Sequence, residues 1–119
     1  MANPFVHLEL NTPDLAKAKE FYGTLFGWKF DDMDMGAPAG IYSTFKPETG
    51  PGGGMMSMPG GSHAWLAYVG VEDINTSTEK AKSLGATICI GPQEIPNIGW
   101  FTMLTDPTGC TVAMFQPKK

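Results

Sequence analysis

The stretch VHLELNTPDLAKAKEFYGTLFGWKF, residues 6–30, decides the fold because a strand pattern is followed at once by a helix pattern. Successive side chains of a strand point to opposite faces of a sheet. His7 and Glu9 therefore share one face, and Leu8 and Leu10 share the other. We expect the apolar face to pack under the helix, which leaves the histidine and the carboxylate on the opposite face.

The helix that follows shows apolar side chains at helical spacing, which predicts one buried stripe. Thr12 is the expected N-cap, and Gly27 is suited to end the helix in a left-handed conformation. Short apolar runs bounded by Gly and Pro come next and are typical of strands. The predicted strands of this half are residues 28–35, 40–46 and 55–58, with the Gly-rich stretch 47–54 as a turn-rich link.

The second half of the chain repeats this order at a fixed offset of 59 residues. Asp14 then corresponds to Asp73, and each precedes a helical pattern. A fixed offset along a whole chain indicates an internal repeat. We predict an α+β fold of two βαβββ modules, residues 1–58 and 63–117, joined by a Gly/Pro link at 59–62. Their curved mixed sheets are expected to form a cleft within one domain, 1–119.

Composition excludes several classes of protein. The chain of 119 residues has a net charge of −4 and scattered Lys and Arg residues, which argues against binding to nucleic acid. No apolar stretch approaches the roughly 18 to 20 residues that cross a bilayer, so no membrane association is expected. Cys89 and Cys110 form no CxxC motif and are read as reduced, buried residues of strands. A cytoplasmic location is the resulting expectation.

Two motifs carry a resemblance to a known family. TPDLAKAKEFYGTLFGW and the DPTG turn before the last strand resemble the vicinal oxygen chelate superfamily, which includes glyoxalase I, bleomycin-resistance proteins and extradiol dioxygenases. The similarity covers essentially the whole chain and looks closest to small glyoxalase-like members. It implies two βαβββ modules around a cleft, commonly in a homodimer, and a divalent-metal site in the enzymes.

The metal site that the resemblance implies is largely missing from this sequence. The family takes ligands from four positions, and of these only His7 carries a ligating side chain. The other three positions are Gly54, Leu66 and Ala113. Glu9 could supply a second ligand, but catalytic zinc sites usually have three protein ligands. We therefore predict no cofactor, with a weakly held divalent metal as the alternative.

The face that carries His7 is expected to line a mostly apolar cleft, which is typical of small-molecule sites. The predicted ligand-binding residues are Phe5, His7, Glu9, Met56, Leu66, Tyr68, Trp100 and Phe115. His7 and Glu9 are also the candidate catalytic residues, because a carboxylate beside an imidazole can support proton transfer. A hydrogen-bonded pair with a purely structural role explains the same two residues.

Three functions remain open at this point. We favour a module that binds a small, partly apolar or aromatic molecule in the cleft, as bleomycin-resistance proteins do. The second is an enzyme: a metal-dependent lyase, isomerase or dioxygenase, or a metal-free acid–base catalyst using His7 and Glu9. The third is an interaction protein whose cleft is filled by a partner subunit. A homodimer is expected from the resemblance and from the exposed sheet edges of two small modules.

Overall fold

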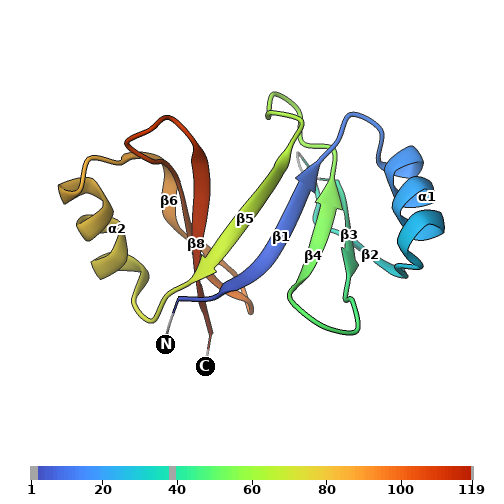
Figure 1. Cartoon of the computed structure of the whole chain (residues 1–119), viewed down its shortest axis with the longest axis horizontal. Coiled ribbons are helices and arrows are strands. Elements are labelled where there is room, and N and C mark those ends of the chain that lie inside the picture. The colour runs from blue at the N-terminus through green and yellow to red at the C-terminus, as the bar shows by residue number, and fades with distance from the viewer. Residues whose placement is uncertain (1–2, 38–39, 119) are drawn as a thin grey trace. The chain divides into compact units, whose positions relative to one another are not determined.

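The computed structural model describes residues 3–37 and 40–118 and contains the strand–helix–three strands order twice (Figure 1). This confirms the predicted α+β class with two βαβββ repeats. The first repeat consists of β1 (Phe5–Asn11), α1 (Leu15–Phe26), β2 (Phe30–Asp34), β3 (Ile41–Phe45) and β4 (Gly52–Met56). The second consists of β5 (Trp65–Gly70), α2 (Ile74–Ser83), β6 (Thr87–Ile95), β7 (Gly99–Thr105) and β8 (Thr111–Pro117).

The chain divides into two compact units. One is His7–Trp65, and the other, called here the C-terminal unit, joins the residues up to Val6 with those from Leu66 onward. In the His7–Trp65 unit the strand order is β2-β3-β4-β1, with β1 and β4 parallel and the other pairs antiparallel. The C-terminal unit has the same pattern in the order β5-β8-β7-β6, with β5 and β8 parallel. The module boundaries at 58 and 63 stay a prediction.

Both helices begin at an aspartate. Asp14 accepts a hydrogen bond from the backbone N–H of Lys17, and Asp73 accepts one from Thr76, each at 3.0 Å. Such a bond satisfies an N–H that has no partner within the helix. The prediction of Thr12 as the N-cap of α1 was wrong, because its hydroxyl instead bonds to the backbone of Asp14.

The core of the His7–Trp65 unit lies between α1 and the sheet. Leu10, Phe45 and Met55 are buried there. The helix side chains of Leu15, Ala18 and Tyr22, together with Trp28 and Phe30, pack against them. Leu10 and Met55 are register partners on β1 and β4. The strand face that carries Leu10 therefore packs under the helix, as the sequence pattern predicts.

Only part of the apolar stripe of α1 packs against the sheet of this unit. Phe21, Leu25 and Phe26 are each more than half exposed. Leu84, the C-cap residue of α2, is also exposed. Periodicity alone does not tell which apolar side chains of a short helix find a partner.

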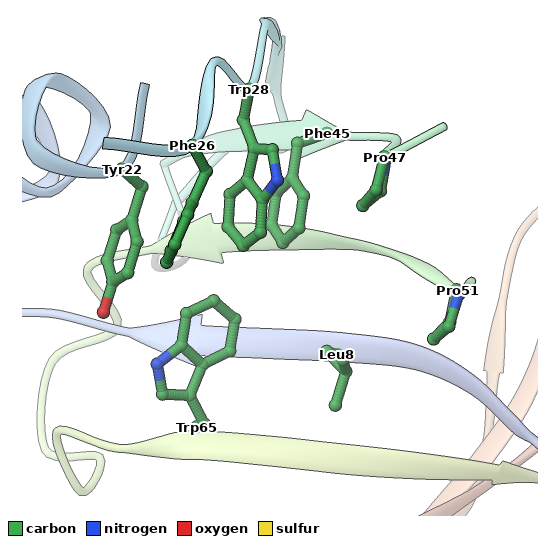
Figure 2. A pocket seen from close by; sticks show the side chains of 8 residues that line it. All are labelled: Leu8, Tyr22, Phe26, Trp28, Phe45, Pro47, Pro51 and Trp65. Atoms are coloured by element: carbon green, nitrogen blue, oxygen red, sulfur yellow. The ribbon is translucent and has the colours of Figure 1, made fainter. Parts of the chain in front are cut away.

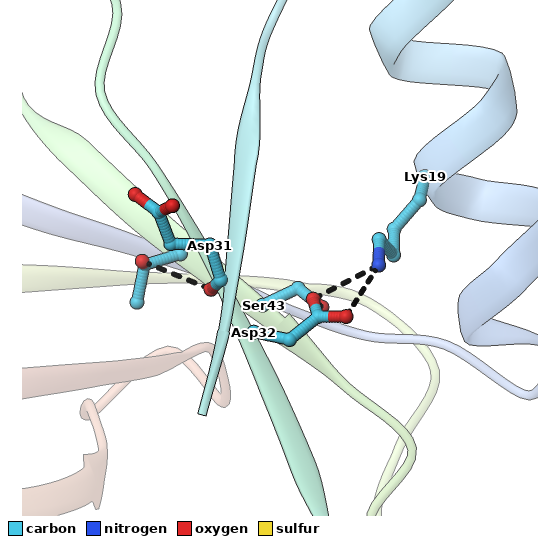
Figure 3. Close-up of polar contacts among 5 residues, drawn as sticks. Lys19, Asp31, Asp32 and Ser43 are labelled. Atoms are coloured by element: carbon cyan, nitrogen blue, oxygen red, sulfur yellow. Dashed lines mark hydrogen bonds and ion pairs between the residues drawn. The ribbon is translucent and has the colours of Figure 1, made fainter. Parts of the chain in front are cut away.

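A polar cluster fastens α1 to the outer strands of its sheet (Figure 3). Both carboxylate oxygens of Asp32 on β2 lie 2.9 Å from Nζ of Lys19, and the Ser43 hydroxyl of β3 donates to the same carboxylate. The Ser43 hydrogen bond, followed by that of Lys19, lowers the pKa of Asp32 below its ordinary value. The carboxylate therefore stays ionised and connects α1 to β2 and β3.

Two further expectations about local structure are corrected. Gly52–Met56 forms β4, so the fourth strand is made largely of glycines that the sequence pattern assigned to a link. Cys89 and Cys110 are both exposed free thiols, and Cys110 precedes β8 rather than lying in it. In the described part of the chain, neither helix is long and apolar enough to span a membrane.

Candidate functional site

The face of β1 opposite the core presents His7 and Glu9. Their register partners on β4 are Gly52 and Gly54, so the same face of the sheet continues across two strands. Both side chains are partly buried, although the strand face lies away from α1. A buried ionisable group requires polar partners.

Tyr42 of β3 joins these two residues through its hydroxyl group. The hydroxyl donates a hydrogen bond to Oε1 of Glu9 at 3.0 Å and lies 2.7 Å from Nε2 of His7. With the phenol proton given to Glu9, the consistent arrangement has the His7 Nε2–H donating to the Tyr42 oxygen. The two rings are nearly parallel, at 13° and 6.3 Å between centroids. We call these three residues the His7–Tyr42–Glu9 cluster.

Gly54 provides the space that Tyr42 occupies. It is the register partner of both Glu9 on β1 and Thr44 on β3. A Cβ atom at position 54 would lie 2.2 Å from carbons of the Tyr42 ring and 2.4 Å from its hydroxyl oxygen. Only glycine therefore allows Tyr42 to lie across β4 and reach β1.

The cluster is a hydrogen-bonded chain that ends in a carboxylate. Burial lowers the pKa of His7 below its ordinary value of 6.5, because the charged imidazolium loses solvation. The imidazole is therefore neutral at neutral pH. A neutral imidazole bonded through a phenol to a carboxylate can hold a polar group of a ligand, or pass a proton along the chain of bonds.

The lowered pKa of His7 predicts a pH-dependent stability. Below about pH 6.5 the unfolded chain binds a proton that the folded chain resists, so stability falls as the pH drops through 6.5 towards the folded-state pKa. We expect urea unfolding to show a larger loss between about pH 7 and 5 in the wild type than in a His7→Gln variant. An identical loss in the two proteins would contradict the burial of a neutral His7.

The residues at the four metal-ligand positions do not fit a divalent ion. Leu66 and Ala113 carry no ligating atom, and Ala113 is completely buried. A ligating side chain at position 54 would overlap the ring of Tyr42. Within residues 3–37 and 40–118, no three His, Cys, Asp or Glu side chains gather as a metal site would require.

The other predicted ligand-binding residues fall into different places. Met56 shares the face of His7 and Glu9, since it is the register partner of Asn11 on β1. Phe5 begins β1 and is 61% exposed. The two residues therefore lie in different units. Met56 adjoins the cluster along β4, whereas Phe5 belongs to the C-terminal unit.

In the C-terminal unit, Tyr68 and Phe115 lie on the sheet face opposite α2. Tyr68 pairs with Ala113 in register, and its ring lies 6.4 Å from that of Phe101. Leu66 shares the face of Tyr68 by strand alternation. Trp100 lies on the other face of β7, where Nζ of Lys118 is 5.1 Å from the centre of its ring. The structure therefore does not bring Trp100 together with the other three, and the binding roles of all four stay a prediction.

The repeat offset gives the cluster a counterpart in the second repeat, and two of its three residues are apolar. The residues 59 positions after His7, Glu9 and Tyr42 are Leu66, Tyr68 and Phe101. The residue 59 positions after Gly54 is Ala113. The same βαβββ framework thus carries His7 and Tyr42 in one unit and Leu66 and Phe101 at the equivalent positions of the other. This contrast indicates that the fold does not require a histidine or a tyrosine at these two positions.

Known proteins with similar sequences are about twice as long as this chain. "Putative glyoxylase CFP32" of Mycobacterium tuberculosis (strain CDC 1551 / Oshkosh) is 29% identical over 117 residues, which cover 94% of this chain and 45% of that protein. "Anthracycline biosynthesis protein DnrV" of Streptomyces peucetius is 26% identical over 128 residues, covering 91% of this chain and 45% of that protein. The chain therefore spans less than half the length of these relatives.

Solved structures share the fold at low sequence identity. The methylmalonyl-CoA epimerase from Mycobacterium tuberculosis superposes with a TM-score of 0.75 at 13% identity, covering 98% of this chain and 89% of that one. A hypothetical protein from Bacillus halodurans C-125 superposes with a TM-score of 0.78 at 12% identity, covering 100% and 97%. Because residues 5–114 also match the family described as Glyoxalase/Bleomycin resistance protein/Dioxygenase superfamily, the chain belongs to that superfamily.

Proposed function

We propose that this chain binds a small, partly aromatic molecule on the sheet face of the His7–Tyr42–Glu9 cluster, without a complete metal site. The observation that carries the proposal is the Tyr42 hydroxyl, bonded to both His7 and Glu9 above Gly54. Partly buried polar groups among apolar neighbours are what fixes the orientation of a ligand in a small-molecule site.

The composition around the cluster supports an organic ligand rather than an ion. The Tyr42 ring offers a flat apolar surface beside its polar hydroxyl, and such amphipathic rings suit partly aromatic molecules. Met56 on the same face of β4 adds a flexible, polarisable side chain that can adapt to a ligand. A hydroxyl or carbonyl group of the ligand would exchange hydrogen bonds with the cluster.

Native mass spectrometry of the protein purified without chelators tests this proposal. We expect an organic molecule of defined mass to accompany the wild type, and its affinity to fall about fivefold to tenfold in Tyr42→Phe, the effect of one lost hydrogen bond. Ser83→Ala on α2 is the control, because it removes an exposed hydroxyl from the other unit, and it should bind as the wild type does.

Two results would count against the proposal. One is a divalent metal present at one ion per chain and lost in His7→Gln, measured by elemental analysis. The other is an organic ligand held equally well by the wild type and by Tyr42→Phe. Either would move the ligand away from the phenol hydroxyl that the proposal places at its centre.

A metal-free acid–base catalyst is the second candidate, because the hydrogen bonds run without a break from His7 through Tyr42 to Glu9. For this candidate, the bound molecule carries an enolisable carbonyl group and exchanges its α-proton with D₂O, as followed by NMR. His7→Gln would abolish the exchange while leaving binding largely intact. Binding without exchange in the wild type favours the first candidate.

We also propose a homodimer in the cytoplasm as the working form. Phe21 and Leu25 expose apolar surface on α1, outside the residues around Trp28 and Phe45, and a second copy could cover it. Light scattering at micromolar concentration tests the dimer, and a stable monomer would contradict it.

A further inference from the structure

A hollow lies on the helix-facing side of the sheet, opposite the face of the His7–Tyr42–Glu9 cluster. It encloses about 310 Å³ within the His7–Trp65 unit. Figure 2 shows the rings of Tyr22, Phe26, Trp28, Phe45 and Trp65 gathered around this space. We call it the aromatic slot. Because side chains alternate along β1, Leu8 faces the slot while His7 and Glu9 face the other way.

The rings of the slot are arranged in two directions. Trp28 is stacked on Phe45 at 4.3 Å and 8°, and Tyr22 is within 15° of the plane of Trp28. Trp65 stands nearly perpendicular to these rings, at 83° to Tyr22 and 89° to Phe45. An inserted flat ring would therefore meet aromatic faces and aromatic edges together, the two arrangements that ring pairs prefer.

The mouth of the slot is open to solvent although its walls are apolar. Phe45 at the base is 5% exposed, whereas Trp65 and Phe26 at the rim are 40% and 56% exposed. Pro47 and Pro51 complete the rim with rigid side chains. Covering such surface is favourable by about 25 cal/mol per Å². A ligand that fills the slot would gain this energy for the apolar surface that it covers.

The size and charge of the slot define the kind of molecule that fits. A volume of about 310 Å³ is at the small end of ligand pockets, which run from roughly 300 to 1,000 Å³. None of the eight lining residues carries an Asp, Glu, Lys, Arg or His side chain. A charged ligand would lose its hydration there without gaining a partner. The occupant that satisfies both conditions is a flat, uncharged molecule of two or three rings.

We propose that the aromatic slot is a second ligand site, which takes an uncharged, flat aromatic molecule of two or three rings. It does not depend on the His7–Tyr42–Glu9 cluster, which lies on the other face of the sheet. The walls come from α1, β1, β3, the first residue of β5 and the connecting segments, and this concave shape suits an inserted ring better than the flat surface of a protein partner. Docking of a second copy on the slot is an outcome of the test below.

N-phenyl-1-naphthylamine, an uncharged three-ring fluorophore, is a suitable probe. The chain has three tryptophans, so Trp100→Phe leaves only Trp28 and Trp65, both in the slot, as energy donors. We expect saturable binding of one probe per chain with energy transfer from tryptophan in this background. The sulfonated analogue 1-anilinonaphthalene-8-sulfonate, with the same rings and one negative charge, should bind at least about tenfold more weakly.

Variants locate the probe. Trp65→Ala should weaken binding about tenfold, and Phe26→Ala, at a position that is 56% exposed, should weaken it about threefold. Tyr42→Phe should leave probe binding unchanged, which separates this site from the one under Proposed function. Circular dichroism confirms that each variant is folded.

Three outcomes would overturn the proposal. The first is probe binding that does not saturate or that is equal for the sulfonated analogue. The second is unchanged affinity in both folded slot variants. The third is probe affinity that falls as the protein concentration rises while light scattering shows a dimer, which would mean that a second copy covers the slot.

Discussion

Replacing Gly53 with alanine is expected to be among the most damaging single substitutions in this chain. A Cβ atom at position 53 would lie 2.0 Å from the backbone carbonyl oxygen of Leu8 and 2.7 Å from the Phe45 ring. The carbonyl cannot move unless β1 shifts against β4, and β4 is paired with β1 along its whole length. Overpacking usually costs about 1–3 kcal/mol, and we expect about 3 kcal/mol or more here.

A substitution at the neighbouring Gly54 is expected to affect ligand binding more than the stability of the fold. Gly54→Ala collides with the Tyr42 side chain, which can rotate away, so its cost in stability should be smaller, about 1–2 kcal/mol. It should nevertheless displace Tyr42 and weaken ligand binding as Tyr42→Phe does. Urea unfolding of both variants measures the difference in stability.

A third glycine provides the control for these two substitutions. Gly23 lies within α1, and a Cβ atom there meets its nearest neighbour at an ordinary 3.4 Å. Gly23→Ala should therefore be neutral or stabilise the protein by up to about 1 kcal/mol, the gain in helix propensity. Equal stability losses for Gly53→Ala and Gly23→Ala would show that β1 and β4 are not as closely packed as the structure indicates.

The repeat made the fold predictable from the sequence. Asp14 and Asp73, 59 residues apart, cap α1 and α2 with the same geometry, and Gly50 and Gly109 at the same offset both adopt positive φ. These are local requirements of a helix start and of a turn, so they leave a local sequence signal. Two copies of the same signals at one offset constrain the architecture more than any single motif.

The nature of β4 could not be predicted in the same way. Glycines weaken an isolated strand, so the run Gly52–Gly54 indicates a loop by its local preference. They form a strand here because β1 and β3 pair with them on either side, and Gly53 and Gly54 must be glycines because the Leu8 carbonyl and the Tyr42 ring leave no room for a side chain. Those reasons lie in other strands of the sheet, and no local pattern contains them.

The candidate site was half visible in the sequence. Alternation along β1 places His7 and Glu9 on one face without any knowledge of the rest of the fold. Tyr42 was missed because its contact depends on the order of β1, β4 and β3 and on their register. A signal did exist, because a glycine at a family ligand position makes room for a large side chain on the next strand. Tyr42 lies two residues from Thr44, the register partner of Gly54, and so points to the same face of the sheet.

Two adjacent methionines on β4 offer the second large effect, because they point to opposite faces of the sheet. Met55 is completely buried between the sheet and α1, in contact with the core residues Leu10 and Phe45. Truncation of a buried methionine to alanine removes apolar contacts and leaves a cavity, which typically costs about 2–5 kcal/mol. We expect Met55→Ala to lose stability in this range with an unchanged dependence on urea concentration.

Met56→Ala is the matched control for that truncation, since the residue type, strand and change are the same. Met56 is partly exposed on the face of the His7–Tyr42–Glu9 cluster, so its truncation should cost about 1 kcal/mol or less. If the proposed ligand site is correct, the same variant should weaken ligand binding, while Met55→Ala should affect binding only through the folded fraction. Equal stability losses for the two variants would mean that β4 does not separate a packed core from a ligand-binding face.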